Sequence, residues 1–588
     1  MRFFPRERAL AQDRPPPHPA SVTSFQLGRA ALEMQLSSAD WGLLEDRGVH
    51  LLVKGSVLSH APREMLDLYR RHGPGFAREL SGSFLLVLVD EALGEALVVT
   101  DQSGSLKAYS ASQDGAIWIS SSVQLLMSQP SLAGRALDPA GVASSLLTGQ
   151  TFDRVTLFQG VRRLERASVH RLSTHPTGPV GDTWGDSGLA LDSREYWTAD
   201  YQPRPALNLA GGQAELGALL IRTLENHWRA AGSAPALSLS AGCDARAILG
   251  LLGEVLGVQN LTTFSYALGK PEEGSDPALS PRLAARYGFK HELIPSYRGD
   301  LLQTLHRNAL WGDGGANFCD EVDAWDTLSR AGLSDVFVGD HAFGWNDRLP
   351  PGDPGYLAEQ AGLLEWRALG WAQPLLAPEV WSGLERGWGR VRAGVLSRLP
   401  PGAPQDQMDG LYLDQRIQHG LMPWREHFTS RAGQVRNVFL DGAVLEFMRR
   451  TPAGMRDDKR LFARTVRALA PDLFALPFAR KLGYKPDWAQ ELFARRGDLA
   501  EELSASSSPL DALVPPETLL RLLGELQPQQ GTSGVGGLAA PIKTRLAQVR
   551  RSGPVSRLLG PLPTRTQVPV SAFLMRALTL RTFLATLP

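Results

Sequence analysis

The chain has 588 residues, and its length and composition limit what it can be. A single hydrophobic core rarely grows past roughly 250–300 residues, so we expect two or more domains. Hydrophobic residues make up 43% of the chain and charged residues 21%, which is typical of soluble globular enzymes and argues against disorder of the whole chain. Lysine plus arginine and aspartate plus glutamate both number 61, so charge gives no reason to expect nucleic acid or an anionic membrane as a partner.

The cysteine content and the apolar runs indicate the compartment. The two cysteines, Cys243 and Cys319, are too few for a disulfide framework. No cysteine and histidine cluster has the spacing of a structural zinc site. No apolar run approaches the roughly 20 residues needed to span a bilayer, and residues 1–19 carry charges and prolines in place of an apolar signal core. We therefore expect a cytoplasmic protein.

The amino-terminal part of the chain is rich in strand patterns. Residues 1–24 are expected to form an irregular arm. Residues 25–175 contain short β-rich apolar runs, such as Phe84–Val89 and Ala96–Val99, which glycine, aspartate and serine separate. Helical spacing is rare there, so we predict a sheet-dominated α+β domain. Residues 176–210 are rich in proline, glycine, threonine and aspartate and are expected to be a linker.

From residue 211 to residue 500 strand and helix patterns alternate. Short strands are predicted at Ala236–Ser240 and Leu261–Tyr266, with a helix over Ala245–Leu256 between them. Such alternation indicates a parallel sheet of α/β type. The fold class expected for the whole chain is thus α/β plus α+β. Residues 501–588 have no acidic residue after Glu525 and are expected to form a solvated, basic helical extension.

The sharpest motif is a small-residue turn between a strand and a helix. The first N–H groups of such a helix lie beside the positive end of its dipole, and small residues let the backbone approach an anion. Asp244 adds negative charge there, a conflict that disappears if it holds Mg²⁺, which prefers oxygen ligands. The alternative is a tight turn in which Asp244 only caps the helix. The loop residues expected to bind ATP or its pyrophosphate are Leu239, Ser240, Ala241, Gly242, Asp244 and Ala245.

Several ordered blocks resemble the asparagine synthetase class B family. The family's pyrophosphate loop reads Ser-Gly-Gly-x-Asp-Ser, and Ser240–Ala245 is similar to it. Thr262–Tyr266 resembles the family's next strand, which contacts the adenine, so Ser265 is expected at the nucleotide. Val336–Gly344 resembles the strand end where Asp-Glu precedes Phe-Gly, and Arg480–Tyr484 resembles an Arg-x-Lys loop. The resemblance implies a pyrophosphate-loop ATP-binding domain.

The same resemblance implies roles for particular residues. Asp340 is the implied second Mg²⁺ ligand, after Gly339 at the nucleotide, and Lys481 is the implied catalytic lysine. A fixed ammonium suits this chemistry because adenylation and acyl transfer build negative charge on phosphate and carbonyl oxygens. The alternatives are a helix-capping Asp340 and a surface Lys481. ATP and Mg²⁺ are the expected cofactors.

The amino-terminal blocks also resemble this family. Leu80–Phe84 and Asp101–Tyr109 are similar to its glutaminase-domain motifs, and glutamine-dependent relatives fold this domain as an N-terminal-nucleophile sandwich of two sheets. Their chemistry needs a cysteine at the mature amino terminus. Here Met1 is followed by Arg2, no cysteine precedes Cys243, and Gln102 stands where arginine is usual. We therefore expect no glutaminase activity and a domain that serves as a packing platform.

An adenylating enzyme without a glutaminase needs another amine. The resemblance leaves three sources: an amine within a small-molecule or peptide substrate, as in β-lactam synthetases and lasso-peptide cyclases, free ammonia, or a second substrate. Relatives carry a glutamate or tyrosine base three residues before the second Mg²⁺ aspartate, where this chain has Phe337. His341 is a candidate base, with a structural role as the alternative. A further acidic cluster is expected to be a solvated face: Asp320, Glu321 and Asp323.

Other functions stay open at this point. The altered loop and the missing base also fit a non-catalytic member that binds a peptide or partner, and by family alone the chain could be a glutamine-hydrolysing asparagine synthase. A tRNA-modifying relative is less consistent, since only the tail is basic. Cys243 is expected to be a small buried hydrophobe, with a reactive thiol as the alternative. The assemblies to expect are a homodimer or a complex with a precursor peptide.

Overall fold

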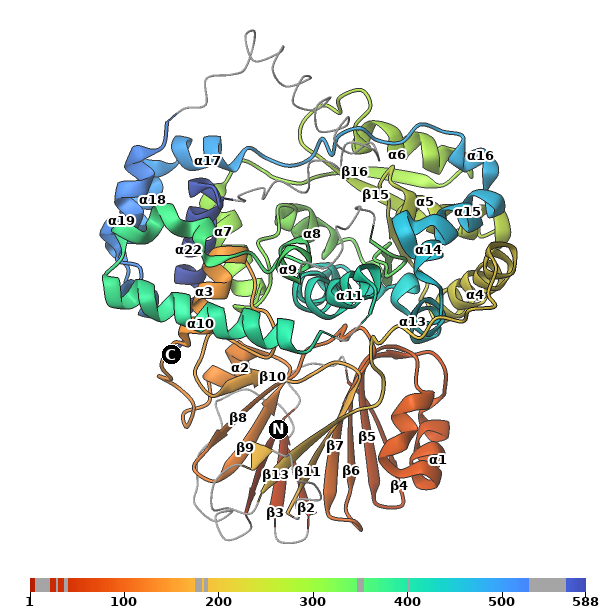
Figure 1. Cartoon of the computed structure of the whole chain (residues 1–588), viewed down its shortest axis with the longest axis horizontal. Coiled ribbons are helices and arrows are strands. Elements are labelled where there is room, and N and C mark those ends of the chain that lie inside the picture. The colour runs from red at the N-terminus through yellow and green to blue at the C-terminus, as the bar shows by residue number, and fades with distance from the viewer. Residues whose placement is uncertain are drawn as a thin grey trace.

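A computed structural model describes most of the chain. The described residues are 1–5, 22–27, 30–35, 41–174, 182–183, 189–345, 354–399, 402–527 and 567–588. Two antiparallel sheets form the lower part of the molecule in Figure 1, and a parallel sheet with many helices forms the upper part. The mixed α/β character predicted from the sequence is confirmed.

The first antiparallel sheet has six strands in the order β10-β8-β9-β1-β3-β2. Its strands are β1 (Arg2–Pro5), β2 (Val22–Leu27), β3 (Ala30–Gln35), β8 (Tyr109–Gln113), β9 (Ala116–Ser120) and β10 (Val161–Arg163). The predicted irregular arm over 1–24 is therefore wrong at both ends, because β1 lies between β9 and β3 and β2 forms the edge. A four-residue strand is too short to show the period-2 pattern that would reveal it. The rest of the arm lies outside the described residues.

The second antiparallel sheet has seven strands in the order β12-β13-β11-β7-β6-β5-β4. Its strands are β4 (Trp41–Asp46), β5 (Val49–Val57), β6 (Gly82–Asp90), β7 (Glu95–Thr100), β11 (Ser168–Ser173), β12 (Asp182–Thr183) and β13 (Ala190–Glu195). The predicted linker over 176–210 is corrected by β13, which pairs with β11 along its whole length. Only its first residues are buried, so the sequence shows little apolar pattern there.

Strand β6 is apolar throughout because it is covered on both faces. Leu85, Val87 and Val89 belong to the core between the two sheets, while Leu86 and Leu88 pack with helix α1 (Pro62–His72). This follows from the alternation of side chains along a strand. The continuous run Phe84–Val89 thus marks a strand buried between a sheet and a helix.

The parallel sheet has five strands in the order β16-β15-β14-β17-β18. They are β14 (Pro235–Ser238), β15 (Thr262–Ala267), β16 (Lys290–Pro295), β17 (Asp335–Phe337) and β18 (Gln434–Arg436), and all four pairings are parallel. The chain moves from β14 outward through β15 and β16, then returns to the other side of β14 with β17. The order therefore reverses between β14 and β17, which is where open α/β sheets bind ligands at their carboxyl ends.

Helices cover this sheet and extend beyond it. Those nearest the sheet are α4 (Leu209–Arg229), α5 (Cys243–Gly250), α6 (Asp276–Ala285), α7 (Leu301–Trp311), α8 (Val322–Leu328), α13 (Gly442–Arg449), α14 (Ala453–Arg456), α15 (Arg460–Leu469) and α16 (Pro471–Phe474). The others are α2 (Val123–Met127), α3 (Pro139–Thr148), α9 (Pro354–Gln360), α10 (Pro378–Ser397), α11 (Pro404–Leu411), α12 (Met422–His427), α17 (Trp488–Ala494), α18 (Arg496–Ala505), α19 (Pro516–Glu525) and α22 (Val570–Ala585).

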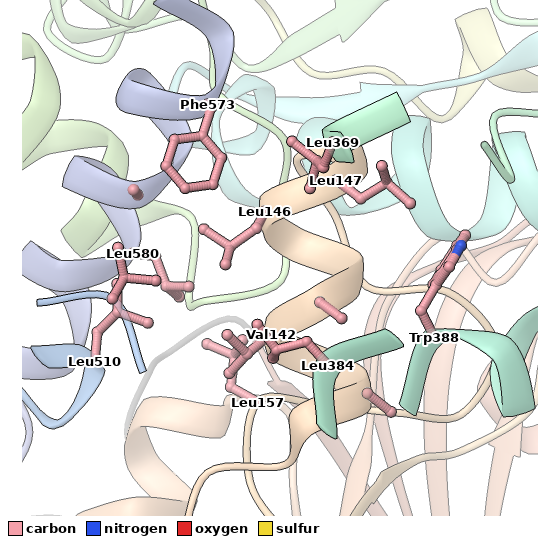
Figure 2. Packing of buried hydrophobic residues seen from close by; sticks show 14 of the residues in the cluster. Val142, Leu146, Leu147, Leu157, Leu369, Leu384, Trp388, Leu510, Phe573 and Leu580 are labelled. Carbon is pink, nitrogen blue, oxygen red and sulfur yellow. The ribbon is translucent and has the colours of Figure 1, made fainter. Parts of the chain in front are cut away.

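The carboxyl-terminal helix α22 is part of the largest core. Figure 2 shows Phe573 and Leu580 of α22 beside Leu146 of α3, and Leu384 and Trp388 of α10 belong to the same cluster. The expectation of a solvated extension over 501–588 is therefore wrong for α22. Its sequence is apolar on all sides, and such a helix is stable in water only when it is buried. Residues 528–566, with most of the basic tail, lie outside the described residues.

Candidate functional site

The predicted phosphate loop lies between β14 and α5. The Leu239 N–H donates to the Phe264 carbonyl of β15 at 2.8 Å, and the Ala241 N–H donates to the Asp276 carboxylate at 2.8 Å. The N-cap of α5 is Gly242, which has no side chain to occupy the first N–H groups. The alternative that Asp244 caps the helix is therefore wrong, and the start of α5 keeps the features of an anion site.

A second strand end lies directly against this loop. A Cβ atom built on Gly339 would stand 2.9 Å from the Ala245 nitrogen and 3.1 Å from the Asp244 Cβ atom. Only glycine allows this approach without displacement of the loop. The segments that follow β14 and β17 thus meet at the reversal point of the sheet, as the sequence predicts.

Asp244 is paired with a lysine that the sequence interpretation missed. Lys459 places its Nζ atom 3.0 and 3.2 Å from the two carboxylate oxygens of Asp244. Asp458 and Lys459 have φ angles of 49° and 53°, in the left-handed region that non-glycine residues rarely adopt. Such strain often accompanies function. The only signal in the sequence was the place of Lys459 in a block that resembles the family.

Asp340 is buried and fully bonded. Both of its carboxylate oxygens accept an N–H from Arg425 at 2.8 Å, and one also accepts from the Asn437 amide at 2.8 Å. Asp340 raises the pKa of Arg425 against the opposing effect of burial. In this arrangement the Asp340 oxygens have no room for a metal, since a guanidinium already occupies them.

The described residues were tested for a magnesium site on their donor groups. They contain no group of three or more histidine, cysteine, aspartate or glutamate side chains placed to hold a metal. Mg²⁺ in nucleotide enzymes often needs only one or two carboxylates, with phosphate oxygens and water as the other ligands. The partly exposed Asp244 fits that requirement if Lys459 moves aside, whereas Asp340 does not.

His341 is not placed as a free base. Burial lowers its pKa to about 4, and its ring stacks at 7° on Phe343, whose backbone N–H donates to Nδ1 at 3.2 Å. Its Nε2 faces Asp244 at 3.7 Å. With Nδ1 accepting, the neutral ring carries its proton on Nε2. The geometry therefore fits the structural alternative better. Phe337, buried in β17 against Trp228, has no group that accepts a proton.

Lys481 is held near the loop by its backbone while its side chain extends outward. The Lys481 carbonyl accepts the Asp276 N–H at 3.2 Å, and Asp276 in turn holds the Ala241 N–H. The Lys481 ammonium pairs with Glu272, and its side chain is 47% exposed. The structure thus brings the backbone of Lys481 to the phosphate loop but leaves its charge at the surface.

Two further predicted or missed residues have defined partners. Ser265 exchanges a hydrogen bond at 3.0 Å with Nε2 of His291, so its hydroxyl is engaged inside β15 and β16. Arg246 was missed by the sequence interpretation. Its buried guanidinium donates to the Ala241 carbonyl and to the carbonyls of Leu473 and Pro477, which ties the loop to the segment that leads to Lys481.

The acidic cluster at 320–323 is not a solvated face. Glu321 and Asp323 are 7% and 1% exposed. Asp323 accepts from the Arg298 N–H at 2.8 Å and from the Arg307 guanidinium at 2.5 Å. Asp320 pairs with Lys485 at 2.5 Å. The sequence prediction is wrong because arginines distant along the chain satisfy these carboxylates and make their burial possible.

The alternative that Cys243 is a reactive thiol has little support. Burial first, and the Asp244 carboxylate second, raise the pKa of Cys243 to about 11, so the thiol stays protonated at neutral pH. Its side chain packs against the core of the parallel-sheet region. These contacts fit the expected small hydrophobe.

The corresponding region of the amino-terminal sheets is filled by protein contacts. Gln102 is buried, and its amide donates to the Leu80 carbonyl at 2.8 Å. The adjacent Asp101 accepts the Phe84 N–H at 3.1 Å together with donors from two serines. Gln102 is therefore a packing residue here, in the position where relatives have the arginine.

The comparisons with known proteins concern this amino-terminal part most directly. Residues 59–178 match the family model described as glutamine amidotransferase domain. No curated protein matches the chain. Among solved structures, glutamine phosphoribosylpyrophosphate amidotransferase from B. subtilis complexed with ADP and GMP is 13% identical, with 54% of this chain and 69% of that chain covered and a TM-score of 0.18.

A second solved structure, described as the allosteric regulatory enzyme of purine biosynthesis, is 12% identical. The match covers 46% of this chain and 68% of that one, also with a TM-score of 0.18. No helix among the described residues has both the length and the apolar content to cross a bilayer. The chain therefore carries an amidotransferase-type domain at residues 59–178.

Proposed function

We propose that the chain is an ATP-dependent amide-forming enzyme without a glutaminase of its own. It adenylates a small-molecule or peptide carboxylate, releases pyrophosphate, and couples the acyl group to an amine or to ammonia. The observation that carries the proposal is the meeting of Ser240–Asp244 with Gly339 at the reversal point of the parallel sheet. The amidotransferase-type domain supports an amide-forming activity in general terms.

The proposed site supplies positive charge for a polyphosphate from several directions. The uncapped start of α5 offers backbone N–H groups, and Lys459 lies beside Asp244 at 3.0 Å. Mg²⁺, when bound with ATP, would neutralise phosphate charge, with Asp244 as its protein ligand. Lys459 is then free to turn from Asp244 to a phosphate oxygen. Lys481 can reach the same region because its backbone is bonded to Asp276 and its side chain is long.

The amine has to come from outside the amino-terminal domain in this proposal. No cysteine precedes Cys243, and Gln102 is bonded to Leu80 where a glutamine-binding arginine would stand. The domain instead contributes contacts to the parallel-sheet part, such as the hydroxyl of Ser81, which donates to Asp441 at 2.8 Å. A glutamine-hydrolysing asparagine synthase is therefore the less favoured alternative. Cytoplasmic location and a homodimer or precursor-peptide complex belong to the same proposal.

The proposal predicts carboxylate-dependent release of pyrophosphate and AMP. The full chain is incubated with Mg·ATP, ammonium, and a panel of amino acids, dicarboxylic acids and short peptides. At least one carboxylate should raise pyrophosphate release above background, and Asp244→Ala should lower that release about 100-fold or more. Asp472→Ala is the matched control, since Asp472 is exposed and pairs with Arg286 far from the loop. Full activity of Asp244→Ala would show that the site is wrong.

A second candidate function is a binding module without catalysis. The observations that favour it are the Arg425 and Asn437 bonds that occupy Asp340, and the outward pair of Lys481 with Glu272. Binding of Mg·ATP separates the two candidates. An enzyme binds the nucleotide at millimolar concentration or below, and a degenerate module does not.

A further inference from the structure

One buried carboxylate near the site has almost no partner. Glu321 is 7% exposed and stands just before α8. In the part of the chain that the structure describes, the only side-chain donor printed for its carboxylate is the thiol of Cys319 at 3.7 Å. The neighbouring carboxylates Asp320 and Asp323 each have a lysine or arginine within 2.5 Å. A buried carboxylate that lacks such a partner costs stability, so it calls for a reason.

Glu321 faces the carboxyl edge of the parallel sheet. After burial, the Glu321 carboxylate is the first charge that raises the pKa of Tyr266 and of Tyr484. It also raises the pKa of Arg425, after Asp340. Glu321 is thus close to a residue at the end of β15, to the loop that carries Lys481, and to the partner of Asp340.

The two tyrosines make one wall of this region. Their ring centroids are 5.4 Å apart. The Tyr484 carbonyl accepts the Ser296 hydroxyl at 2.6 Å, while the Tyr266 hydroxyl lies 3.4 Å from the Ser238 Oγ atom at the end of β14. The carboxylate of Glu321 therefore lies on the same side of the sheet as the phosphate loop, beside groups that are fixed by the strands.

We propose that Glu321 accepts the proton of the attacking amine in the second half-reaction. This inference rests on the proposed function. The amine nitrogen bonds to the acyl carbon of the adenylate, the N–H proton passes to the Glu321 carboxylate, and the acyl carbon–oxygen bond to AMP breaks with its electron pair on the AMP phosphate. The proton then leaves Glu321 for solvent. The other candidates are less suitable, since Phe337 has no basic group and Nδ1 of His341 already accepts an N–H.

The charge environment suits a base that works near neutral pH. Burial, then Asp320, raises the pKa of Glu321 to about 7, and Lys485 and the Cys319 contact oppose the rise. Arg425 and the two tyrosines are the other titratable groups that face it. A base with this pKa is deprotonated in part at neutral pH and still binds a proton strongly enough to assist the attack.

The test compares the two half-reactions in Glu321→Gln, which keeps the size and removes the base. Pyrophosphate release reports adenylation, and mass spectrometry of the amide formed with ammonium reports the second step, for a carboxylate identified in the panel above. We expect pyrophosphate release within twofold of wild type and amide formation about 100-fold slower or more. Glu321→Asp should recover part of the rate, and Glu292→Gln, which lies on β16 paired with Lys290, should behave as wild type.

Two further readouts separate a base from a packing role. Hydroxylamine, a strong nucleophile that is largely neutral at pH 7, should restore product formation in Glu321→Gln. The rate of the second step should fall below about pH 7 in wild type and lose that dependence in the variant. An unchanged amide rate, or an equal loss in both steps, would overturn the role of Glu321. Absence of pyrophosphate release by wild type with every carboxylate would instead overturn the proposed function.

Discussion

Asp101 and Glu321 are two buried carboxylates with opposite surroundings. Asp101, in the amidotransferase-type domain, is 0% exposed and accepts the backbone N–H groups of Phe84, Ser103 and Ser105 as well as serine hydroxyls. Glu321, at the edge of the parallel sheet, has only a thiol close by. The first arrangement stabilises a fold, whereas the second costs stability. Unfavourable groups are expected where chemistry takes place, and this contrast places the chemistry in the parallel-sheet part.

The largest expected effect is on the bonded carboxylate. Asp101→Ala leaves several buried N–H and O–H donors without an acceptor, so thermal stability should fall by about 3–5 kcal/mol. Scanning calorimetry of the full chain measures this change. Mg·ATP affinity of the folded protein should stay the same, and a loss of affinity would show that the amino-terminal domain takes part in nucleotide binding.

The opposite carboxylate should give an effect of opposite sign. The pKa of Glu321 in the folded chain, about 7, is above the ordinary value of 4.5, so the folded state holds more protons than the unfolded state between these values. Stability from this group is complete below pH 4.5 and is lost as the pH rises through 7. Glu321→Gln should therefore be more stable than wild type at pH 8, by on the order of 3 kcal/mol, and equal to it at pH 4. A lower melting temperature at pH 8 would contradict the comparison.

A smaller loss is expected where the two strand ends meet. Gly339→Ala places a methyl group 2.9 Å from the Ala245 nitrogen, so the phosphate loop has to shift. We expect a loss of about 1–3 kcal/mol in stability and a tenfold or greater loss in Mg·ATP affinity. Gly370→Ala is the matched control, because a Cβ atom there meets nothing within 4 Å. Unchanged affinity in Gly339→Ala would show that the loop position does not matter for the nucleotide.

The smallest effect on stability is expected at the surface lysine. Lys481 and Glu272 are 47% and 67% exposed, and exposed pairs contribute little. Lys481→Ala should change the melting temperature by no more than about 0.5 kcal/mol would, while pyrophosphate release falls strongly. Glu272→Ala serves as the control with its activity retained. Retained activity in Lys481→Ala would remove this residue from the mechanism.

The sequence could predict the parts of the fold that repeat a local pattern. The parallel sheet follows from alternating strand and helix patterns, and the loop at Ser240–Asp244 follows from small residues at a strand end. Strand β1 has too few residues for a pattern. Helix α22 was taken as solvated because its basic neighbours in sequence suggested a tail, although its own residues are apolar on all sides.

The contacts of the site depend on residues far apart in the chain, and the sequence could not supply these. Arg425 bonds Asp340 across 85 positions, and Lys459 reaches Asp244 across 215. Glu321 stands in an acidic run that is typical of a surface, and only the fold buries it. The residue types of the site were therefore predictable, while their pairing was not.

The central claim is that the loop before α5 binds the phosphates of ATP. Isothermal titration of the full chain with Mg·ATP tests it most directly, together with Asp244→Ala and the control Asp472→Ala. The account predicts a dissociation constant below about 1 mM for wild type and for the control, and binding at least tenfold weaker for Asp244→Ala. No heat of binding at millimolar nucleotide, or equal affinity in all three proteins, would contradict it.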